Sequence, residues 1–295
     1  MERLLIVGCG DVARRALPAL ARRYRVYALA RNASAAAELR ALGVIPIKGD
    51  LDHPESLGRL AGLAPLVWHF APPQASGEHD TRTRALIAAL ALRGSLPRAL
   101  VYISTSGVYG DCAGARVSET WPPRPATARA RRRLDAERRL RRLARRGVRV
   151  AILRAPGIYA HDRLPLERLQ RGEPVLRRED DVQTNHIHAE DLVRMAGLAM
   201  HRARGGRTFN AVDDSALSMG DYFDQVADAC GLARPPRVSR TEAPARLSQL
   251  SLSFMSESRV LDNRRVKSEL RYRLRWPTVA ATLSSLREVP PACSG

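Results

Sequence analysis

The stretch RLLIVGCGDVA (Arg3–Ala13) decides the fold class. It begins as a short apolar run typical of a buried strand, and the following residues, Asp11–Arg23, have the apolar spacing of a helix. Between the two segments, Gly8, Gly10 and Ala13 form a G-x-G-x-x-A pattern. The first glycine allows a tight turn, the second lets the backbone approach a pyrophosphate, and a small third residue lets helix and strand pack closely. The stretch therefore predicts a dinucleotide-binding turn.

The same alternation of strand and helix continues through the first half of the chain. Further strands are expected at Arg25–Ala30, Val44–Leu51, Pro65–Pro73 and Ala99–Asp111, with helices at Pro54–Ala61 and Thr81–Arg93. Regular alternation implies right-handed crossovers and a parallel sheet. We therefore predict an α/β fold built on a doubly wound parallel sheet of the Rossmann type, with ligands at the carboxyl ends of its strands.

The end of the second expected strand bears on the choice of cofactor. An NAD site usually has an acidic residue at this position for the ribose hydroxyls, whereas an arginine suits a 2′-phosphate. Here the strand is followed by Arg31 and Asn32. The sequence therefore favours NADP, although NAD stays possible because arginine is abundant throughout this chain.

The composition limits the classes of protein to consider. The net charge is +19, and of 49 basic residues only Lys48 and Lys267 are lysines, so arginines are spread along the whole chain. The arginine-rich stretch Pro125–Arg139 has an apolar stripe continued by Leu140 and Leu143, which predicts a helix whose arginines lie largely on the solvated side. We expect a small anionic ligand rather than nucleic acid.

The cysteines and the apolar runs indicate the compartment. The four cysteines lie far apart, without a C-x-x-C pair, which argues against a zinc site or a disulfide framework and for a reducing compartment. The first apolar run is too short for a signal peptide, and no run has the length of a membrane span. We expect a cytoplasmic protein without a membrane partner, as a monomer or homodimer.

Several motifs together resemble a known superfamily. GCGDVA, GDL, HFAPP, YISTSGVYGD, LRAPGIYA and NHIHAEDL are similar in order and spacing to the short-chain dehydrogenase/reductase superfamily, in particular its extended branch of nucleotide-sugar epimerases and dehydratases. The resemblance extends from Leu4 to about Asp191 and more weakly through Ser256–Leu270. With the turn and Arg31, it assigns to the cofactor Gly8, Gly10, Asp11, Val12, Ala13, Arg31, Asn32, Asp50, Leu51, Ala71, Pro72, Ser104, Arg133 and Pro156.

The resemblance also implies how the chain is divided. Residues 1–155 would form the dinucleotide-binding domain, and residues 156–295 a smaller C-terminal α/β lobe that selects the substrate, with some strands returning to the main sheet. Loops at Arg163–Val175 and Leu247–Asp262 would bound its pocket. The elements expected in this half are helices near Leu164–Arg171, Ala189–Arg202, Met219–Cys230, Asn263–Leu270 and Pro277–Arg287, and a strand at Arg207–Val212.

The resemblance breaks at the residues that carry the chemistry of the superfamily. Thr105 matches the Ser/Thr that binds the reacting oxygen, but a Tyr-x-x-x-Lys pair is expected about 25 residues later. In its place stand Arg129 and Arg133. An arginine stays protonated near neutral pH, so Arg129 cannot exchange a proton with a substrate hydroxyl. Arg133 can still bind a ribose or a phosphate.

Other residues could supply the missing acid. Thr105, Tyr109 and Tyr159 are the catalytic candidates, with packing at the strand end as the alternative for Tyr109. His161 is a further possible acid. His186 and His188 form an H-x-H pair that lacks a third ligand at recognisable spacing, so no metal site is predicted. Cys112 follows the fifth expected strand, and nothing near it indicates a nucleophile.

Two functions remain open at this stage. The first is an atypical NADP-dependent oxidoreductase or epimerase-like enzyme that acts on a small, anionic sugar-nucleotide or carbonyl compound. The intact Ser-Thr-Ser segment (Ser104–Ser106) favours it. The second is a non-catalytic dinucleotide-binding sensor or regulatory protein, which the missing Tyr-x-x-x-Lys pair favours.

Overall fold

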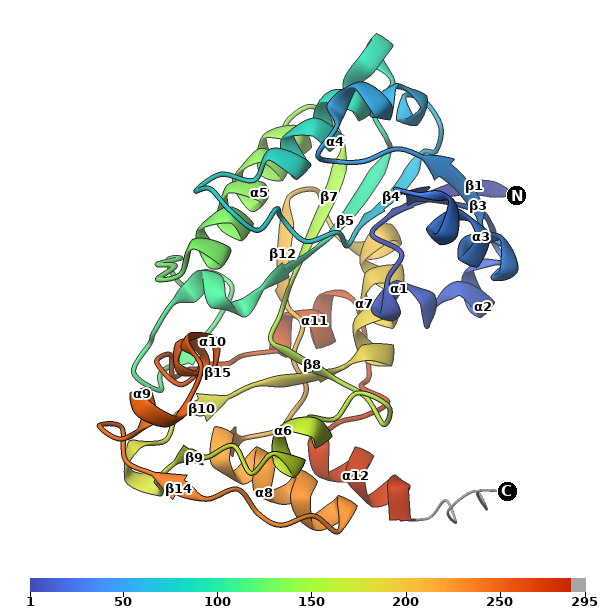
Figure 1. The fold of residues 1–295 in the computed structure, drawn as a ribbon. Helices are drawn as coiled ribbons and strands as arrows, with labels where there is room; N and C mark the ends of the chain where they lie inside the picture. The colour runs from blue at the N-terminus through green and yellow to red at the C-terminus, as the bar shows by residue number, and fades with distance from the viewer. Residues whose placement is uncertain (288–295) are drawn as a thin grey trace, which may run out of the picture.

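A parallel sheet of seven strands forms the centre of the structure, a computed structural model that describes residues 1–287 (Figure 1). Across the sheet the strands are β12 (Arg207–Asn210), β7 (Arg149–Ala155), β5 (Ala99–Thr105), β4 (Leu66–His69), β1 (Glu2–Val7), β2 (Tyr24–Ala30) and β3 (Ile45–Lys48). All neighbours pair in parallel. The chain winds outward from β1 in both directions, so the predicted doubly wound α/β fold is confirmed.

The central strand β1 separates two hydrophobic cores. Successive side chains of a strand point to opposite faces. Accordingly, Leu4 and Ile6 pack into one core and Leu5 and Val7 into the other, and all four are fully buried. This explains why the sequence reads as a continuous apolar run rather than an alternating one.

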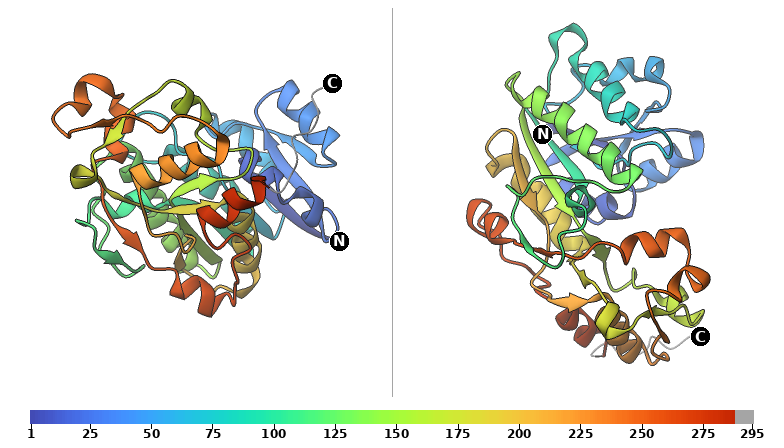
Figure 2. Two further views of the ribbon diagram at one scale, coloured as in Figure 1. Left: turned by 90° about the horizontal axis from the view of Figure 1, so that it is seen from below. Right: turned by 90° about the vertical axis from the view of Figure 1, so that its left-hand side faces the viewer.

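Helices cover both faces of the sheet (Figure 2). The face of Leu4 is covered by α1 (Asp11–Arg14), α2 (Leu17–Leu20), α3 (Ala33–Ala41) and α7 (Ala189–Arg202). The face of Leu5 is covered by the 3-10 helix η1 (Pro54–Leu60), α4 (Thr81–Ala91) and α5 (Ala128–Ala144). Short 3-10 turns, η2 (Leu92–Gly94) and η3 (Ser106–Tyr109), follow α4 and β5.

The first helix differs from the sequence prediction. A continuous helix was expected over Asp11–Arg23, but the structure has two helices of four residues each, α1 and α2. Pro18 lies in the first turn of α2. Proline has no N–H to donate, and its ring clashes with the carbonyl four residues earlier, so the helix ends before it and starts again around it.

The arginine-rich helix α5 is less solvated than the sequence suggested. Arg131, Arg138 and Arg142 are exposed as expected, whereas Arg132 is buried. Its Nη1 donates to the carbonyl of Gly77, 2.6 Å away. The apolar stripe gives the correct helix, but the loop that covers one side of it was not predicted.

The second half of the chain forms a smaller lobe below the sheet in Figure 1. Its third hydrophobic core is centred on α8, with Tyr222, Phe223 and Val226 buried. Strand β12 instead completes the main sheet beside β7. The division of the chain at residue 155 stays a prediction.

Short elements make up this lobe and its contacts with the first half. The strands form the pairs β6 (Arg116–Val117) with β15 (Val260–Leu261), β8 (Gly157–Tyr159) with β11 (His186–His188), β9 (Val175–Leu176) with β14 (Arg237–Val238), and β10 (Gln183–Thr184) with β13 (Leu217–Ser218). The helices are α6 (Leu166–Gln170), η4 (Arg178–Asp180), α8 (Met219–Cys230), α9 (Ala243–Arg246), α10 (Gln249–Phe254), α11 (Arg264–Glu269) and α12 (Val279–Arg287).

The sequence predicts neither a membrane span nor a metal site. Within residues 1–287, no helix has the length and apolar character needed to cross a membrane. The same residues contain no cluster of three or more potential metal ligands. Cys9, Cys112 and Cys230 are free thiols, and Cys293 lies outside the described residues.

Candidate functional site

The glycine turn after β1 is fixed by its contact with β4. Phe70 and Ala71 donate their backbone N–H groups to the carbonyl of Val7, at 2.8 and 2.9 Å. Gly8 has a φ of +94°, and a Cβ at this position would overlap the backbone of Ala71. Only glycine therefore fits at position 8, because the backbone of Ala71 lies against it.

Gly10 is constrained differently. Its φ is −88°, and a Cβ built on it would have no neighbour within 4 Å. The space beside it is thus open in the free protein, as a site for a pyrophosphate requires. Val12 and Ala13 pack into the core below, and Ala13 is buried.

The other positions expected to contact the cofactor lie at the ends of β2, β3 and β4. Arg31 is exposed, and Asn32 accepts a hydrogen bond from Ala35 N (2.8 Å) at the start of α3. Asp50 accepts from Asp52 N at 3.0 Å, and Leu51 is buried. These contacts shape the loops, but they leave the guanidinium of Arg31 free for a phosphate.

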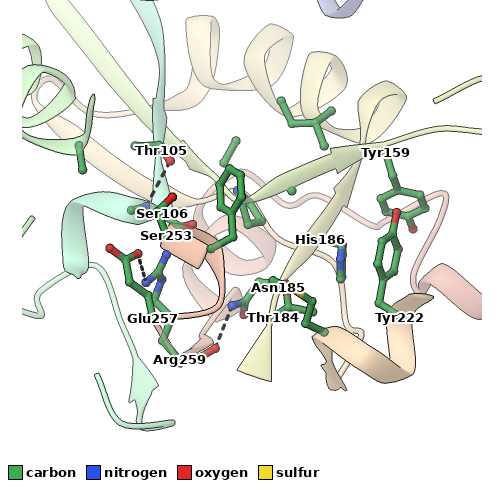
Figure 3. A pocket seen from close by; sticks show the side chains of 18 of the residues that line it. Thr105, Ser106, Tyr159, Thr184, Asn185, His186, Tyr222, Ser253, Glu257 and Arg259 are labelled. Carbon is green, nitrogen blue, oxygen red and sulfur yellow. Dashed lines mark hydrogen bonds and ion pairs between the residues drawn. The ribbon is translucent and has the colours of Figure 1, made fainter. Parts of the chain in front are cut away.

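A cavity of about 560 Å³ opens at the carboxyl ends of β5 and β7 and extends into the second lobe (Figure 3). It brings together a subset of the predicted site residues: Ser104, Thr105, Arg133, Pro156 and Tyr159. Residues of both expected lobe loops also line it, among them Arg168 and Glu257. The described lining residues do not include the glycine turn, but Arg163, which does line the cavity, donates to Asp11 Oδ2 at 2.9 Å and so links the two regions.

The cavity is strongly cationic. Its lining includes Arg129, Arg133, Arg163, Arg168 and Arg259, and Glu257 is the single carboxylate among the described lining residues. Glu257 is already bound by Arg259 Nη1 at 2.8 Å. A wall with such an excess of guanidinium groups fits an anionic ligand.

Arg129 and Arg133, which replace the expected tyrosine and lysine, both face this cavity but differ in their contacts. Arg133 Nη1 donates to the carbonyl of Ile103 (2.8 Å) and to the hydroxyl of Tyr102 (3.0 Å). Arg129 has no hydrogen bond or ion pair in the described structure, and its guanidinium lies 4.8 Å from the ring centre of Phe254. Arg129 is therefore the freer cation for binding a ligand.

A buried ion pair supports the floor of the site. Arg154 in β7 donates to both carboxylate oxygens of Glu137, at 3.0 and 2.7 Å, and both side chains are almost completely buried. Ser104 Oγ donates to the same carboxylate at 2.7 Å. Glu137 also pairs with Arg141 one turn further along α5, at 3.0 Å, but its own side chain is fully buried.

The three catalytic candidates are placed differently. Thr105 lines the cavity, and its Oγ1 accepts from Gly107 N at 3.2 Å. Tyr109 is fully buried away from the lining, with its hydroxyl donated to Asn210 at 2.7 Å. The geometry therefore favours the packing role for Tyr109 over proton donation.

Tyr159 lines the cavity with its ring, but its hydroxyl donates to buried Asp213 at 3.1 Å. Burial raises the pKa of Asp213 to about 7, so this carboxyl group is partly protonated near neutral pH. Burial also raises the pKa of Tyr159 far above its usual value. Tyr159 alone is thus a weak acid at neutral pH, and its role in catalysis stays a prediction.

The other candidates considered from sequence lie outside the reactive centre. Cys112 has a pKa raised by burial, which disfavours a nucleophilic thiolate. His161 binds Ser285 Oγ at 2.8 Å. His188 accepts from Glu190 N at 3.3 Å, at the start of α7.

Several residues of the lobe line the cavity although the sequence did not predict them there. Asn185, His186 and Tyr222 reach the cavity from the end of β10, from β11 and from α8. The H-x-H motif had drawn attention to His186 only as a possible metal ligand. Nothing in the local sequence shows that Tyr222 would pack against it.

Comparison with known proteins assigns the family. Residues 8–194 match the NAD(P)H-binding family. The chain therefore belongs to this NAD(P)H-binding family. A comparison with curated proteins gave no match.

Solved structures with the same fold agree with the resemblance seen in the sequence. A functionally unknown conserved protein from Silicibacter pomeroyi DSS is 28% identical, with a TM-score of 0.80, over 98% of this chain and 99% of that chain. The UDP-glucose 4-epimerase of Thermotoga maritima, solved with UDP-glucose, is 18% identical, with a TM-score of 0.75 over 97% and 99%. The UDP-glucuronic acid 4-epimerase of Bacillus cereus, solved with NAD, is 17% identical, with a TM-score of 0.72 over 97% and 99%. The predicted relation to the extended short-chain dehydrogenase/reductases is confirmed at the level of the fold.

Proposed function

We propose that this protein is an NADP(H)-dependent, epimerase-like or reductase enzyme that acts on a small anionic sugar-nucleotide or carbonyl compound without the usual Tyr-x-x-x-Lys pair. The observation that carries the proposal is the arginine-lined cavity that is linked to the glycine turn through the contact of Arg163 with Asp11. A cofactor at the turn and an anion in the cavity would then be neighbours.

The preference for NADP(H) rests on the end of β2. Arg31 is exposed there and has no hydrogen bond in the described residues, so its guanidinium can meet a 2′-phosphate. Titration of both reduced cofactors tests this point, because tighter binding of NADH than of NADPH would overturn it.

Each residue of the site would have a separate role in the reaction. Thr105 would hydrogen-bond the reacting oxygen at the end of β5, and Arg133 would hold the ribose or a phosphate. Arg129 would bind the anionic group of the substrate, since it has no competing ion pair. A water molecule, or Tyr159 with Asp213, would move the proton. When bound, the nicotinamide supplies or accepts the hydride.

A turnover assay tests the enzyme proposal. NADPH oxidation would be followed with small carbonyl compounds, and NADP⁺ reduction and epimer formation with a panel of UDP-sugars and sugar phosphates. Thr105→Val removes the hydroxyl with little change in volume and should slow turnover at least tenfold, whereas Thr105→Ser keeps the hydroxyl and should retain most of it. Equal rates for both variants would remove Thr105 from the reaction.

A second function, a non-catalytic dinucleotide sensor, has its own supporting observation. The hydroxyls of Tyr109 and Tyr159 are both bound to other protein groups, and the usual acid is an arginine. A sensor would bind NADPH and change its conformation without consuming it with any member of the panel. Turnover with one substrate would exclude this alternative.

A further inference from the structure

His186 is one of the residues by which the lobe lines the cavity. It lies in β11, directly opposite Gly157 of β8 in the parallel register. The side chain lines the cavity although the residue is only 4% exposed (Figure 3). It thus belongs to the cavity wall while being almost completely withdrawn from bulk solvent.

The faces of the imidazole ring are occupied by packing. Tyr222 stacks on it with ring centres 4.0 Å apart and an interplanar angle of 23°. Tyr159 meets it edge-on, with ring centres 6.1 Å apart. On the side of Gly157, a Cβ would lie 3.3 Å from the Cδ2 atom of His186. A ligand in the cavity would therefore contact His186 through a ring nitrogen.

Neither ring nitrogen has a hydrogen-bond partner within residues 1–287, and Nδ1 is completely covered. The other two buried histidines each use a nitrogen. His69 Nε2 binds Thr83 Oγ1 at 2.8 Å, and His188 Nδ1 accepts from Glu190 N. Because Nδ1 is covered by protein atoms, a ligand cannot reach it, and Nε2 is the nitrogen that a ligand in the cavity can contact. Such a contact would supply the first hydrogen bond to this ring.

The residues around His186 indicate what kind of chemical group could hydrogen-bond to it. Burial lowers the pKa of His186 to about 3, so the ring is neutral near pH 7 and offers one N–H donor and one acceptor nitrogen. The two rings that contact it, those of Tyr222 and Tyr159, carry no charge. The positive charge of the cavity is supplied by its five lining arginines, of which Arg129 has no hydrogen bond or ion pair in the described residues.

We infer that His186 is a substrate-binding residue that hydrogen-bonds an uncharged oxygen, a hydroxyl or a carbonyl, of a ligand whose anionic group is bound by the cavity arginines. A polyhydroxylated ring fits this subsite, because aromatic side chains bind its apolar face while a neutral imidazole binds a hydroxyl. The inference deepens the proposed function and rests on it for the identity of the ligand. The unpartnered state of His186 does not depend on that function.

The test compares His186→Phe with His69→Phe. Phenylalanine keeps a planar ring against Tyr222 and removes both nitrogens. The ligand-free His186→Phe variant should unfold at the same temperature as the wild type or a few degrees higher, since no hydrogen bond is lost. His69→Phe should unfold at a lower temperature, because the Thr83 hydroxyl loses a buried hydrogen-bond partner.

Binding is then measured by calorimetry with NADP⁺-loaded protein and UDP-glucuronate and UDP-glucose as probes. His186→Phe should bind NADPH within about twofold of the wild type and bind the sugar-nucleotide probes at least tenfold more weakly. His186→Gln, which keeps a donor and an acceptor, should recover part of the loss.

The possible results separate the two proposals. Wild-type protein that binds no NADPH would refute the proposed function, and the unfolding temperatures would still decide on His186. Unchanged probe binding by His186→Phe, or a fall in unfolding temperature equal to that of His69→Phe, would overturn the inference. If NADP⁺ binds and neither probe does, the unfolding comparison alone decides: a fall shows a structural histidine, and equal or greater stability supports the ligand role.

Discussion

The glycine turn after β1 and the start of α5 lie at neighbouring strand ends, yet they differ in what determines their residues. Gly8 is required because the backbone of β4 lies against it, whether or not a cofactor is bound. Arg129 and Arg133 instead line a cavity, where Arg133 is held by the Ile103 carbonyl and the guanidinium of Arg129 lies over the ring of Phe254. The glycine turn is thus set by the fold, whereas the guanidinium of Arg129 has no hydrogen bond or ion pair in the part of the chain that the structure describes. A family member can change its chemistry at the second place without disturbing the first.

The largest effect should come from the turn itself. Gly8→Val would place a branched side chain at positive φ against the backbone of Ala71, which should cost about 5 kcal/mol of unfolding free energy or abolish folding. Gly10→Ala is the matched control, because its φ is allowed and the space beside it is open. It should leave denaturant unfolding unchanged and weaken NADPH binding at least tenfold. Equal loss of stability in both variants would break the comparison.

The next effect concerns the middle of α5, where Glu137 packs inside the protein and does not line the cavity. Glu137→Gln leaves the buried Arg154 guanidinium without its counter-charge, and should lower the unfolding free energy by about 3–5 kcal/mol. Glu38→Gln breaks an exposed pair with Arg14 and should cost less than about 1 kcal/mol. Urea unfolding of both variants measures the difference, and similar values would show that the buried pair contributes little.

A pH dependence should follow from Asp213. Because burial raises its folded pKa to about 7 from 3.8, the native state binds more protons than the unfolded state between these values. The contribution of Asp213 to stability is therefore fully present below about pH 4 and is lost as the pH rises through 7. Between pH 5 and 8 this loss should be roughly 2–3 kcal/mol.

Asp213→Asn removes this titration. Relative to the wild type, the unfolding free energy of the variant, measured with urea, should therefore increase from pH 5 to pH 8. A difference that does not change with pH would show that Asp213 is already ionised at pH 5.

The most specific change tests the two arginines at the start of α5, Arg129 and Arg133. The double variant Arg129→Tyr with Arg133→Lys rebuilds the usual acid–base pair on an unchanged fold. It should raise turnover of an uncharged carbonyl substrate with NADPH by roughly a hundredfold, the typical contribution of a general acid. It should also weaken binding of UDP-glucuronate, because Arg129 is lost. The single variant Arg129→Leu is the control: it should lose affinity for the anion without gaining rate.

The sequence predicted those parts of the structure that depend on local pattern. The apolar run before Gly8 and the regular alternation after it identify the sheet, and the helices α7 and α8 have the bounds expected from periodicity. The break between α1 and α2 was visible in Pro18 but was outweighed by the helical spacing around it.

The parts that were missed depend on contacts between residues distant in the chain. Glu137 has the sequence context of a surface residue, and only Arg154 in the neighbouring strand explains its burial. Arg163, Arg168 and Arg259 line one cavity because two segments of the lobe, one with Arg163 and Arg168 and the other with Arg259, pack together. In a chain with so many arginines, no local signal distinguishes these from the solvated ones.

The most direct test of the account is calorimetric titration of the wild-type chain with NADPH and NADH, repeated with Gly10→Ala. We predict one NADPH per chain, bound more tightly than NADH, with the affinity reduced at least tenfold in the variant at unchanged stability. Absence of binding by either nucleotide, or equal binding by wild type and Gly10→Ala, would contradict the claim that the glycine turn holds the cofactor.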